Sequence, residues 1–432
     1  MAEPLVMAAT SDVAGQLRGK GFALADLDRR RRSGVGWTPT NVQITCFDGI
    51  APSPYGSTGD MVLWPDETLY EAPVGDGPPL RLVLGDVRDA DGAPWEACLR
   101  GHLRAAIAGF EAASDLTIMA SFEHEFTLTG LDAGPAFSAS GFHRAQGFAE
   151  ALLTSLQSAG LEPDSFLREF GPGQFEVTLA PKPAMQAADE AIILREITRA
   201  VARSHGLKAT FSPISDPESV GNGVHVHLSY WTRDGTPRTH DPDHPVGLTP
   251  IAGHAAAGIL RHMPALSALT APTAISFIRL QPHRWSAAFA NLAIQDREAG
   301  LRICPTSARD ATGKARQFNY EYRAADAAAS PWLTLSGLIF AATAGVRDGL
   351  PCPEPTKGDL SELSAEALQS MGIEPLPRTP TEALLALEND RSFTAHYPQR
   401  FVAIYLAHKR FEFEAEASTS QTDLMKRYAE VY

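Results

Sequence analysis

The chain has 432 residues, a formal net charge of −14 and 44% hydrophobic residues. This length allows a large core divided among two or three domains, and the composition is that of an ordinary globular protein, which excludes the disordered and collagen-like classes. The negative charge argues against broad nucleic-acid or anionic-membrane binding, because either polyanion would be repelled by such a surface. Any phosphate group must therefore be bound locally.

The cysteines and the N-terminus give the first clues to the compartment. Cys46, Cys98, Cys304 and Cys352 are scattered without a CxxC pair, so they are interpreted as small buried apolar residues. The N-terminus lacks a basic segment followed by a long apolar run, and the longest apolar segment, around residues 331–345, is too short to span a bilayer. We therefore expect a cytoplasmic protein.

The strands and helices expected along the sequence predict an α+β fold. The first hundred residues combine short apolar segments with many turns, which is typical of a small β-rich domain with a boundary near residue 100. Helical periodicity follows at residues 99–113, 148–160 and 185–206, the last helix ending at Gly206 as an expected C-cap. Strand-like runs lie at residues 116–128, 165–170, 174–179, 208–214 and 223–231. Together they predict an antiparallel sheet flanked by helices.

Two strand-like runs carry paired polar residues. Glu123 and Glu125 are two positions apart, so a strand would point both carboxylates to the same face. His225 and His227 have the same spacing in a later run. Two carboxylates on one face are costly unless a cation lies beside them.

A third pair depends on a predicted hairpin. A two-residue turn at Pro172 and Gly173 would place Glu169 opposite Glu176 across two strands. Like charges facing each other destabilise a sheet, and a metal ion would remove that cost.

The alternative interpretation is that each pair marks the solvent side of a half-exposed strand. Three such pairs between residues 123 and 227 favour a metal site instead. Mostly oxygen ligands with an imidazole favour Mg²⁺ or Mn²⁺ over Zn²⁺, which prefers cysteine and histidine.

A second cluster, between residues 279 and 323, gathers basic side chains around the acid Glu321. Its arginines are Arg279, Arg297, Arg302, Arg316 and Arg323. Guanidinium groups suit carboxylates and phosphates, so beside a metal site they indicate a place where a nucleoside triphosphate and an acidic substrate meet. For Arg261 and Arg284 we expect surface salt bridges instead.

The segments EHEF, GPGQFEV, GNGVHVHLS, FIRL, DREAGLRI and YEYR resemble the glutamine synthetase family in order and spacing, over nearly the whole chain. The resemblance implies a β-grasp-like N-terminal domain at residues 1–105 and a catalytic domain at residues 106–432. It also implies two or more Mg²⁺ or Mn²⁺ ions per active site, which would bridge the phosphates of the co-substrate ATP. One metal would be held by Glu125, Glu169 and Glu176, and a second by Glu123, His225 and Glu321, with Glu176 able to touch both.

The resemblance also assigns groups to the substrates. Arg279 would bind the α-carboxylate of glutamate, and Gly221 would lie at its ammonium side. The groups expected to line the nucleotide are His227, Ser229 and Arg316. Those expected to stabilise the phosphoryl group in transfer are Arg297, Arg302 and Arg323.

The segment FDG at residues 47–49 resembles the family motif whose aspartate reaches the amine site of a neighbouring subunit. By that resemblance Asp48 would be this residue, and a ring-shaped homo-oligomer, commonly a dodecamer, is implied.

The sequence departs from the family pattern at the acceptor site. Trp285 stands where members that use ammonia have a glutamate, and a tryptophan cannot accept a proton. An indole instead offers an apolar or stacking wall for an organic amine. The alternative is that Trp285 packs within the flap, residues 279–288, while another group acts as base. Val220, Ile214 and Asn319 also replace family residues, near the amino acid and the nucleotide.

We therefore predict an ATP-dependent ligase that joins the γ-carboxylate of glutamate to a small organic amine through a γ-glutamyl phosphate. The first alternative is a glutamine synthetase that uses ammonia. A catalytically silent oligomeric scaffold is a distant third, because all six expected metal ligands are present. Neither nucleic acid nor membrane is expected as a partner.

Overall fold

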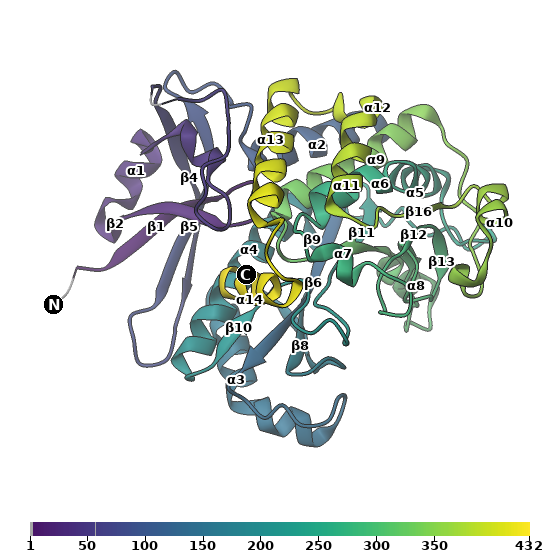
Figure 1. Cartoon of the computed structure of the whole chain (residues 1–432), viewed down its shortest axis with the longest axis horizontal. Coiled ribbons are helices and arrows are strands. Elements are labelled where there is room, and N and C mark those ends of the chain that lie inside the picture. Colours follow the sequence, from purple (N-terminus) through teal and green to yellow (C-terminus); the bar gives the residue numbers. More distant parts are fainter. Residues whose placement is uncertain (1–2, 57) are drawn as a thin grey trace.

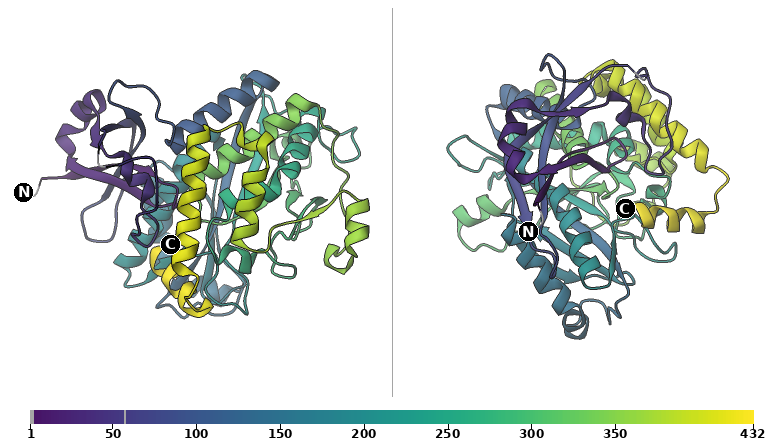
Figure 2. Two further views of the ribbon diagram at one scale, coloured as in Figure 1. Left: turned by 45° about the horizontal axis from the view of Figure 1, so that its top comes forward. Right: turned by 90° about the vertical axis from the view of Figure 1, so that its left-hand side faces the viewer.

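The computed structural model describes residues 3–56 and 58–432, and a small N-terminal sheet lies at one end of a larger α+β body (Figures 1 and 2). The small sheet has the strand order β2-β1-β5-β4-β3, in which β1 and β5 are parallel and the other pairs are antiparallel. Its strands are β1 (Leu5–Ser11), β2 (Leu17–Ala23), β3 (Val35–Trp37), β4 (Met61–Ala72) and β5 (Leu80–Asp89). Helix α1 (Leu27–Ser33) packs against β4. The prediction of a small N-terminal β domain is confirmed.

The larger body contains a nine-stranded sheet whose main path is β13-β14-β15-β11-β6-β8-β7, with β9 and β10 also paired to β6. Its strands are β6 (Thr117–Thr129), β7 (Pro163–Arg168), β8 (Gln174–Leu179), β9 (Lys182–Pro183), β10 (Lys208–Thr210), β11 (Val224–Trp231), β13 (Leu292–Ile294), β14 (Leu301–Ile303) and β15 (Tyr320–Ala325). The predicted antiparallel sheet is confirmed with one correction, because β13 and β14 at the edge are parallel. Strands β12 (Phe289–Ala290) and β16 (Glu374–Pro375) form a separate pair.

Helices supply the buried layer behind this sheet. The three helices expected from periodicity are α2 (Leu99–Ser114), α3 (Ala139–Ser158) and α4 (Ala184–Ser204). Helix α3 begins earlier than predicted, because the side chain of Ser138 accepts a hydrogen bond from Gly141 N and caps it. Gly206 has a φ of +69° just after the C-cap of α4, as expected for a glycine at that position.

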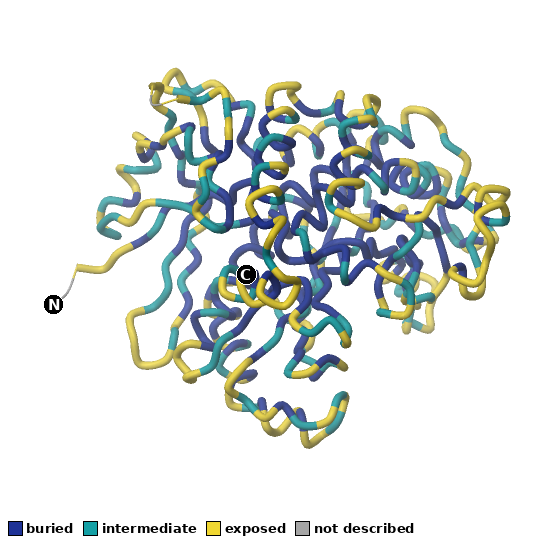
Figure 3. The backbone as a smooth tube through the Cα atoms, in the orientation of Figure 1, coloured by how far each residue is buried: buried dark blue, intermediate teal, exposed yellow. Residues whose placement is uncertain are grey.

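The remaining helices surround this layer and the C-terminal end. They are α5 (Pro250–Arg261), α6 (Met263–Thr270), α7 (Ser276–Arg279), α8 (Ala311–Gln317), α9 (Pro331–Asp348), α10 (Ala365–Ser370), α11 (Pro380–Asn389), α12 (Arg391–Thr394), α13 (Gln399–Glu416) and α14 (Gln421–Val431). Helix α9 packs against α2, α4 and α5 in the interior, where buried residues predominate (Figure 3). Within the described residues, no helix is long and apolar enough to cross a membrane.

Strand β6 explains how one sheet serves both the core and a polar site. Its side chains alternate in burial, and the fully buried ones include Phe122 and Phe126, which face the helical layer where α4 packs. Glu123 and Glu125 fall on the opposite face. The predicted period-two arrangement of these carboxylates is confirmed.

A buried ion network joins the small sheet to the larger body. Arg100 on α2 donates to Asp86 Oδ1 on β5 and, through Nε, to Asp189 Oδ1 on α4, each at 3.1 Å. It also pairs with Asp66 on β4. The arginine is only 4% exposed, and removing one partner of a buried charge pair leaves the other uncompensated. The network therefore fixes the N-terminal sheet relative to helices α2 and α4 of the larger body.

His102 on α2 gives the fold a testable pH dependence. Burial between Tyr397 and Phe401 lowers its pKa to about 4, from an unfolded value near 6.5. A depressed histidine pKa stabilises the fold above the unfolded pKa, and this stability is lost as the pH falls toward the folded pKa. The free energy of unfolding should fall between about pH 7 and about pH 5 in the wild type, and this fall should be smaller by about 2 kcal/mol in His102→Phe. Urea unfolding at both pH values measures this, with exposed His143→Gln as control; an unchanged difference contradicts the assignment.

Candidate active site

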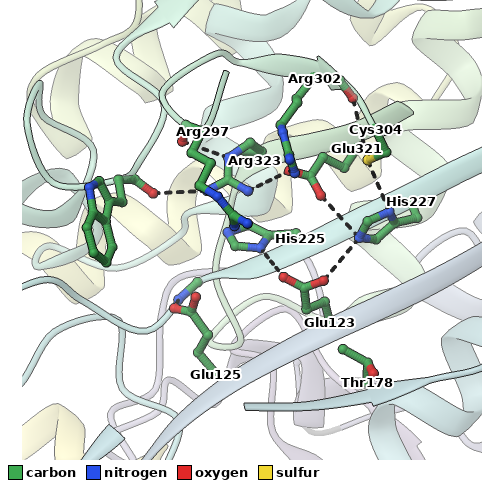
Figure 4. A network of polar contacts seen from close by, with 12 residues as sticks. Glu123, Glu125, Thr178, His225, His227, Arg297, Arg302, Cys304, Glu321 and Arg323 are labelled. Carbon is green, nitrogen blue, oxygen red and sulfur yellow. Dashed lines mark hydrogen bonds and ion pairs between the residues drawn. The ribbon is translucent and has the colours of Figure 1, made fainter. Parts of the chain in front are cut away.

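The register of four neighbouring strands places the predicted polar residues in rows across one face of the sheet. His225 on β11 lies directly opposite Glu123 on β6, and His227 on β11 lies opposite Glu321 on β15. Arg302 on β14 faces Glu321 from the other side. Segments that are distant in the sequence thus meet at one site (Figure 4).

Glu123, His225 and Glu321 form a compact group of possible metal ligands. His225 Nδ1 lies 2.8 Å from Glu123 Oε1, and each of the three residues offers a ligand atom within 4.8 Å of the others. His227 Nε2 lies 3.3 Å from Glu123 Oε2 and 3.2 Å from Glu321 Oε2. The structure thus brings together the three residues predicted for the second metal, with His227 directly beside them.

The predicted hairpin register is wrong. Leu167, and not Glu169, is the partner of Glu176 on β7, and Glu169 N instead donates to Gln174 O at 3.0 Å. The connection is a four-residue loop at residues 170–173, with Gly173 at a φ of +64°, so the ladder is shifted by two residues from a two-residue turn. A Pro-Gly pair does not form the twist-matched turn that a two-residue hairpin needs.

Glu176 nevertheless faces a carboxylate, on the other neighbouring strand. Its direct partner across the two strands is Glu125: Glu176 lies on β8 and Glu125 on β6. Burial, followed by the negative charges of Glu123, Glu125 and Glu169, raises the pKa of Glu176 to about 10. Burial and the charge of Glu125 raise the pKa of Glu169 to about 7. The cost that motivated a metal site is therefore present, although the predicted pair was the wrong one.

The donor set fits a hard divalent cation. The raised pKa of Glu176 indicates that the protein's own groups do not neutralise this cluster, and a cation would. Carboxylate oxygens with one imidazole are ligands that Mg²⁺ and Mn²⁺ accept. Glu321 has a different environment: burial opposes its ionisation, yet the charge of Arg323 and of the nearby histidines lowers its pKa to about 2.

Arg279 and Gly221 are in direct contact, as their joint assignment to glutamate requires. A Cβ on Gly221 would lie 2.2 Å from Pro213 O and 2.8 Å from Arg279 Cγ, so no larger residue fits. Arg279 is 2% exposed, and Nη1 donates to Ser286 Oγ at 3.1 Å, while Nε is buried without a protein partner. An unpartnered buried guanidinium nitrogen is suited to a carboxylate.

Glu321 also organises the other arginines. Arg302 Nη1 donates to Glu321 Oε1 at 2.9 Å, and Arg323 Nη1 binds the same oxygen. Arg323 Nε donates to Arg297 O at 2.9 Å, and the side chain of Arg297 is directed toward the cluster (Figure 4). Two of the three arginines predicted to act on the phosphoryl group, Arg302 and Arg323, therefore bind one carboxylate, and the third, Arg297, is joined to Arg323 through its backbone.

A cleft of about 630 Å³ opens beside the carboxylates, a size typical of ligand pockets. It is lined by the predicted nucleotide residues His227, Ser229 and Arg316, together with Glu123 and Glu176. The expected nucleotide groups and two of the six expected metal ligands therefore line the same cleft.

Several residues of this site were not found from the sequence. Trp231 lines the cleft, donates from Nε1 to Ser229 Oγ at 2.9 Å and lies 5.8 Å below the Arg316 guanidinium. The sequence could have indicated Trp231, because a residue two positions after Ser229 on the same strand points to the same face. Cys304 is buried, as predicted. Its Sγ lies 3.8 Å from His227 Nδ1, so it also belongs to the polar cluster.

The other three residues that depart from the family pattern lie in different parts of the structure. Asn319 Oδ1 lies 2.9 Å from His227 Nδ1, inside the cleft. Val220 directly precedes Gly221, the residue expected at the ammonium side of glutamate, and is half-buried. Ile214 is fully buried in a small core cluster with Ile275.

Asp48 lies apart from this cluster. It is exposed, with a φ of 60°, and the adjacent Phe47 packs against Tyr428 on α14 at 4.8 Å between ring centroids. Within residues 3–56 and 58–432, no hydrogen bond or ion pair links Asp48 to the carboxylate cluster. Its assignment to a neighbouring subunit's site stays a prediction.

Comparisons with known proteins agree with the sequence motifs. Residues 96–428 match the glutamine synthetase catalytic domain, and residues 3–95 match the glutamine synthetase N-terminal domain. A gamma-glutamylpolyamine synthetase of Streptomyces coelicolor is 35% identical over 403 residues, covering 89% of this chain and 84% of that protein. A glutamine synthetase of Methanocaldococcus jannaschii is 30% identical over 394 residues, covering 88% and 84%. A crystal structure described as a novel glutamine synthase homolog has a TM-score of 0.92 and 40% identity, covering 100% of this chain and 99% of that one.

The chain therefore belongs to the glutamine synthetase family, and the resemblance noted in the sequence is confirmed. It is an enzyme of the carbon–nitrogen ligase class, of the type that uses ATP to join glutamate to ammonia or an amine. The family uses divalent metals, and the chain has a donor group suited to them.

Removing one carboxylate tests the metal assignment. Glu176→Gln resembles the protonated acid, so the melting temperature in EDTA should change little. The stabilisation gained on adding MgCl₂ should fall, with an apparent Kd raised about tenfold or more, or ~1.4 kcal/mol. Thermal unfolding across a MgCl₂ titration measures both. Glu162→Gln, at an exposed pair with Lys182, is the matched control; a wild-type metal response in Glu176→Gln would falsify the assignment.

Proposed function

We propose that this enzyme joins the γ-carboxylate of glutamate to a small organic amine and converts ATP to ADP and phosphate in the process. A γ-carboxylate oxygen attacks the γ-phosphorus of ATP, ADP leaves, and an acyl phosphate results. The amine nitrogen then attacks the acyl carbon, the bond to phosphate breaks, and a proton is lost. The observation that carries the choice of an organic amine is the pairing of two exposed aromatic rings beside the carboxylate cluster.

For the first step, ATP is assigned to the cleft beside the carboxylates. Two Mg²⁺ or Mn²⁺ ions, held by Glu125, Glu169 and Glu176 and by Glu123, His225 and Glu321, would neutralise its phosphates when bound. His227, Ser229 and Arg316 would hold the nucleotide, with Trp231 supporting the last two. Neutralising cations are needed because a carboxylate attacking a polyphosphate brings negative charges together.

Glutamate is assigned to the pocket formed by Arg279 and Gly221. The buried, unpartnered Nε of Arg279 supports binding of the α-carboxylate there. Arg297, Arg302 and Arg323 would stabilise the phosphoryl group during transfer. Glu321 orients the guanidinium groups of Arg302 and Arg323 before substrate arrives, so little reorganisation is required.

For the acceptor, Trp285 and Phe170 supply the evidence. Their ring centroids are 5.0 Å apart with the planes tilted by 57°, although Trp285 is 46% exposed and Phe170 is 52% exposed. Phe170 directly follows Glu169, and its amide donates to that carboxylate at 3.0 Å. A paired aromatic surface next to an expected metal ligand offers a wall to the organic part of an amine, and aromatic faces also attract ammonium groups.

The quaternary structure and compartment belong to the same proposal. The exposed position of Asp48 suits a residue that completes the amine site of a neighbouring subunit in a ring-shaped homo-oligomer. A cytoplasmic location is consistent with the expected substrates.

An amine panel tests this proposal. Purified enzyme with ATP, Mg²⁺ and glutamate is assayed for amide by mass spectrometry, using ammonium, methylamine, ethanolamine, a diamine and aniline. We expect kcat/KM to be at least about tenfold higher for an organic amine than for ammonium, since burying a few methylenes against the aromatic pair contributes about 1–3 kcal/mol. Phe170→Ala should lower that preference without changing the KM for ATP.

Trp285→Glu is the complementary variant. It restores a carboxylate where ammonia-using members have one, so turnover with ammonium should rise relative to organic amines. Efficient turnover of ammonium by the wild type, unaffected by Trp285→Glu, would support glutamine synthesis and contradict the organic-amine proposal.

A further inference from the structure

The flap, residues 279–288, has a strained backbone next to the glutamate pocket. His283 has a φ of +62° and Trp285 a φ of +51°, so two non-glycine residues within three positions adopt the left-handed conformation. Such conformations cost free energy and persist only where neighbouring groups hold them. Contacts with three other segments hold this flap.

The first is the carboxylate of Glu298, in the connection between β13 and β14. Its Oε2 accepts a hydrogen bond from His283 N at 3.1 Å, and its Oε1 accepts one from Trp285 N at 3.4 Å. Both accepted amides belong to the two strained residues. The single side chain of Glu298 therefore stabilises both strained residues.

The second is Arg284, which lies between the two strained residues. Its Nη1 donates to Ser219 O at 2.8 Å and its Nη2 to Pro217 O at 2.7 Å. The surface salt bridge expected for Arg284 is thus wrong, whereas the one expected for Arg261 is confirmed with Asp348. The carbonyls that Arg284 binds lie in the segment that leads into Val220 and Gly221, so this fork ties the flap to the glutamate pocket.

A third contact connects the flap to the arginine cluster. The carbonyl of Trp285 accepts a hydrogen bond from Arg323 Nη2 at 3.1 Å, and Arg323 also binds Glu321. The flap is therefore held at its amides, at its side chain and at its carbonyl by three different segments.

We propose that Arg284 and Glu298 are positioning residues that form a flap latch, which keeps the flap closed over the acyl phosphate so that the amine reacts with it before water does. The proposal rests on the function proposed above. With an open flap, a water oxygen attacks the acyl carbon, the bond to phosphate breaks, and glutamate, phosphate and a proton are released. ATP is then consumed without amide, since closed sites protect reactive intermediates from hydrolysis.

The test compares Arg284→Lys and Glu298→Gln with Arg261→Ala, a surface ion-pair control of unrelated location. Lysine keeps the charge but cannot donate to two carbonyls in a fork, and glutamine keeps the shape but loses the charged acceptor. The readout is the ratio of phosphate released to amide formed, with glutamate, ATP, Mg²⁺ and the best amine of the panel. For the wild type and Arg261→Ala we expect the ratio of a fully coupled reaction, in which each phosphate released corresponds to an amide formed. Each latch variant should raise it by about threefold or more, as expected from weakening hydrogen bonds to the closed flap.

Hydrogen–deuterium exchange of the peptide covering residues 280–290 in the substrate-free enzyme gives a second readout. The amides of His283 and Trp285 should exchange faster in both latch variants and at the wild-type rate in Arg261→Ala. Unchanged exchange together with an unchanged phosphate-to-amide ratio would overturn the latch. A proportional loss of all rates with unchanged coupling would also overturn it, because that pattern indicates a merely structural role. If the wild type forms no amide with any amine, the proposed function fails, and exchange still decides whether the latch exists.

Discussion

Electrostatic repulsion between carboxylates on one face of the catalytic sheet is the constraint on which the rest of the site depends. Glu125 and Glu176 face each other across β6 and β8, and burial together with the neighbouring negative charges raises the pKa of Glu176. A fold selected for stability alone would place apolar or oppositely charged residues there. The arrangement is understandable when a divalent cation supplies the missing charge, and the proposed chemistry requires such a charge beside the phosphates of ATP.

Positive charge is arranged by the same sheet, one strand further along. Glu321 on β15 contacts His227 on one side and two arginines on the other, so it connects the carboxylate cluster to the guanidinium cluster. Because Glu321 is 1% exposed, these contacts are little weakened by solvent. The sheet thus keeps opposite charges separate but adjacent, which is the arrangement a phosphoryl transfer between two anions needs.

The proposed acceptor side lies on loops, unlike this rigid centre on the sheet. Phe170 and Trp285 come from loops, one after β7 and the other in the flap, and their rings meet in an exposed position. Loops on a rigid scaffold can vary without disturbing the core, so a change of acceptor requires few substitutions. The contacts made by Arg284 and Glu298 give the flap a defined conformation in which Trp285 stays exposed.

The sequence by itself determined the fold class, the family and the faces of the strands. The spacing of Glu123 with Glu125, and of His225 with His227, follows from the period-two geometry of a strand, which is local. Which residue lies opposite which was decided only by the tertiary structure. The hairpin prediction failed by two residues because a four-residue loop replaced the expected turn. Arg284 was assigned to a surface ion pair because its carbonyl partners lie in a distant segment. Cross-strand register and loop contacts depend on packing between segments remote in the sequence, and no local periodicity encodes them.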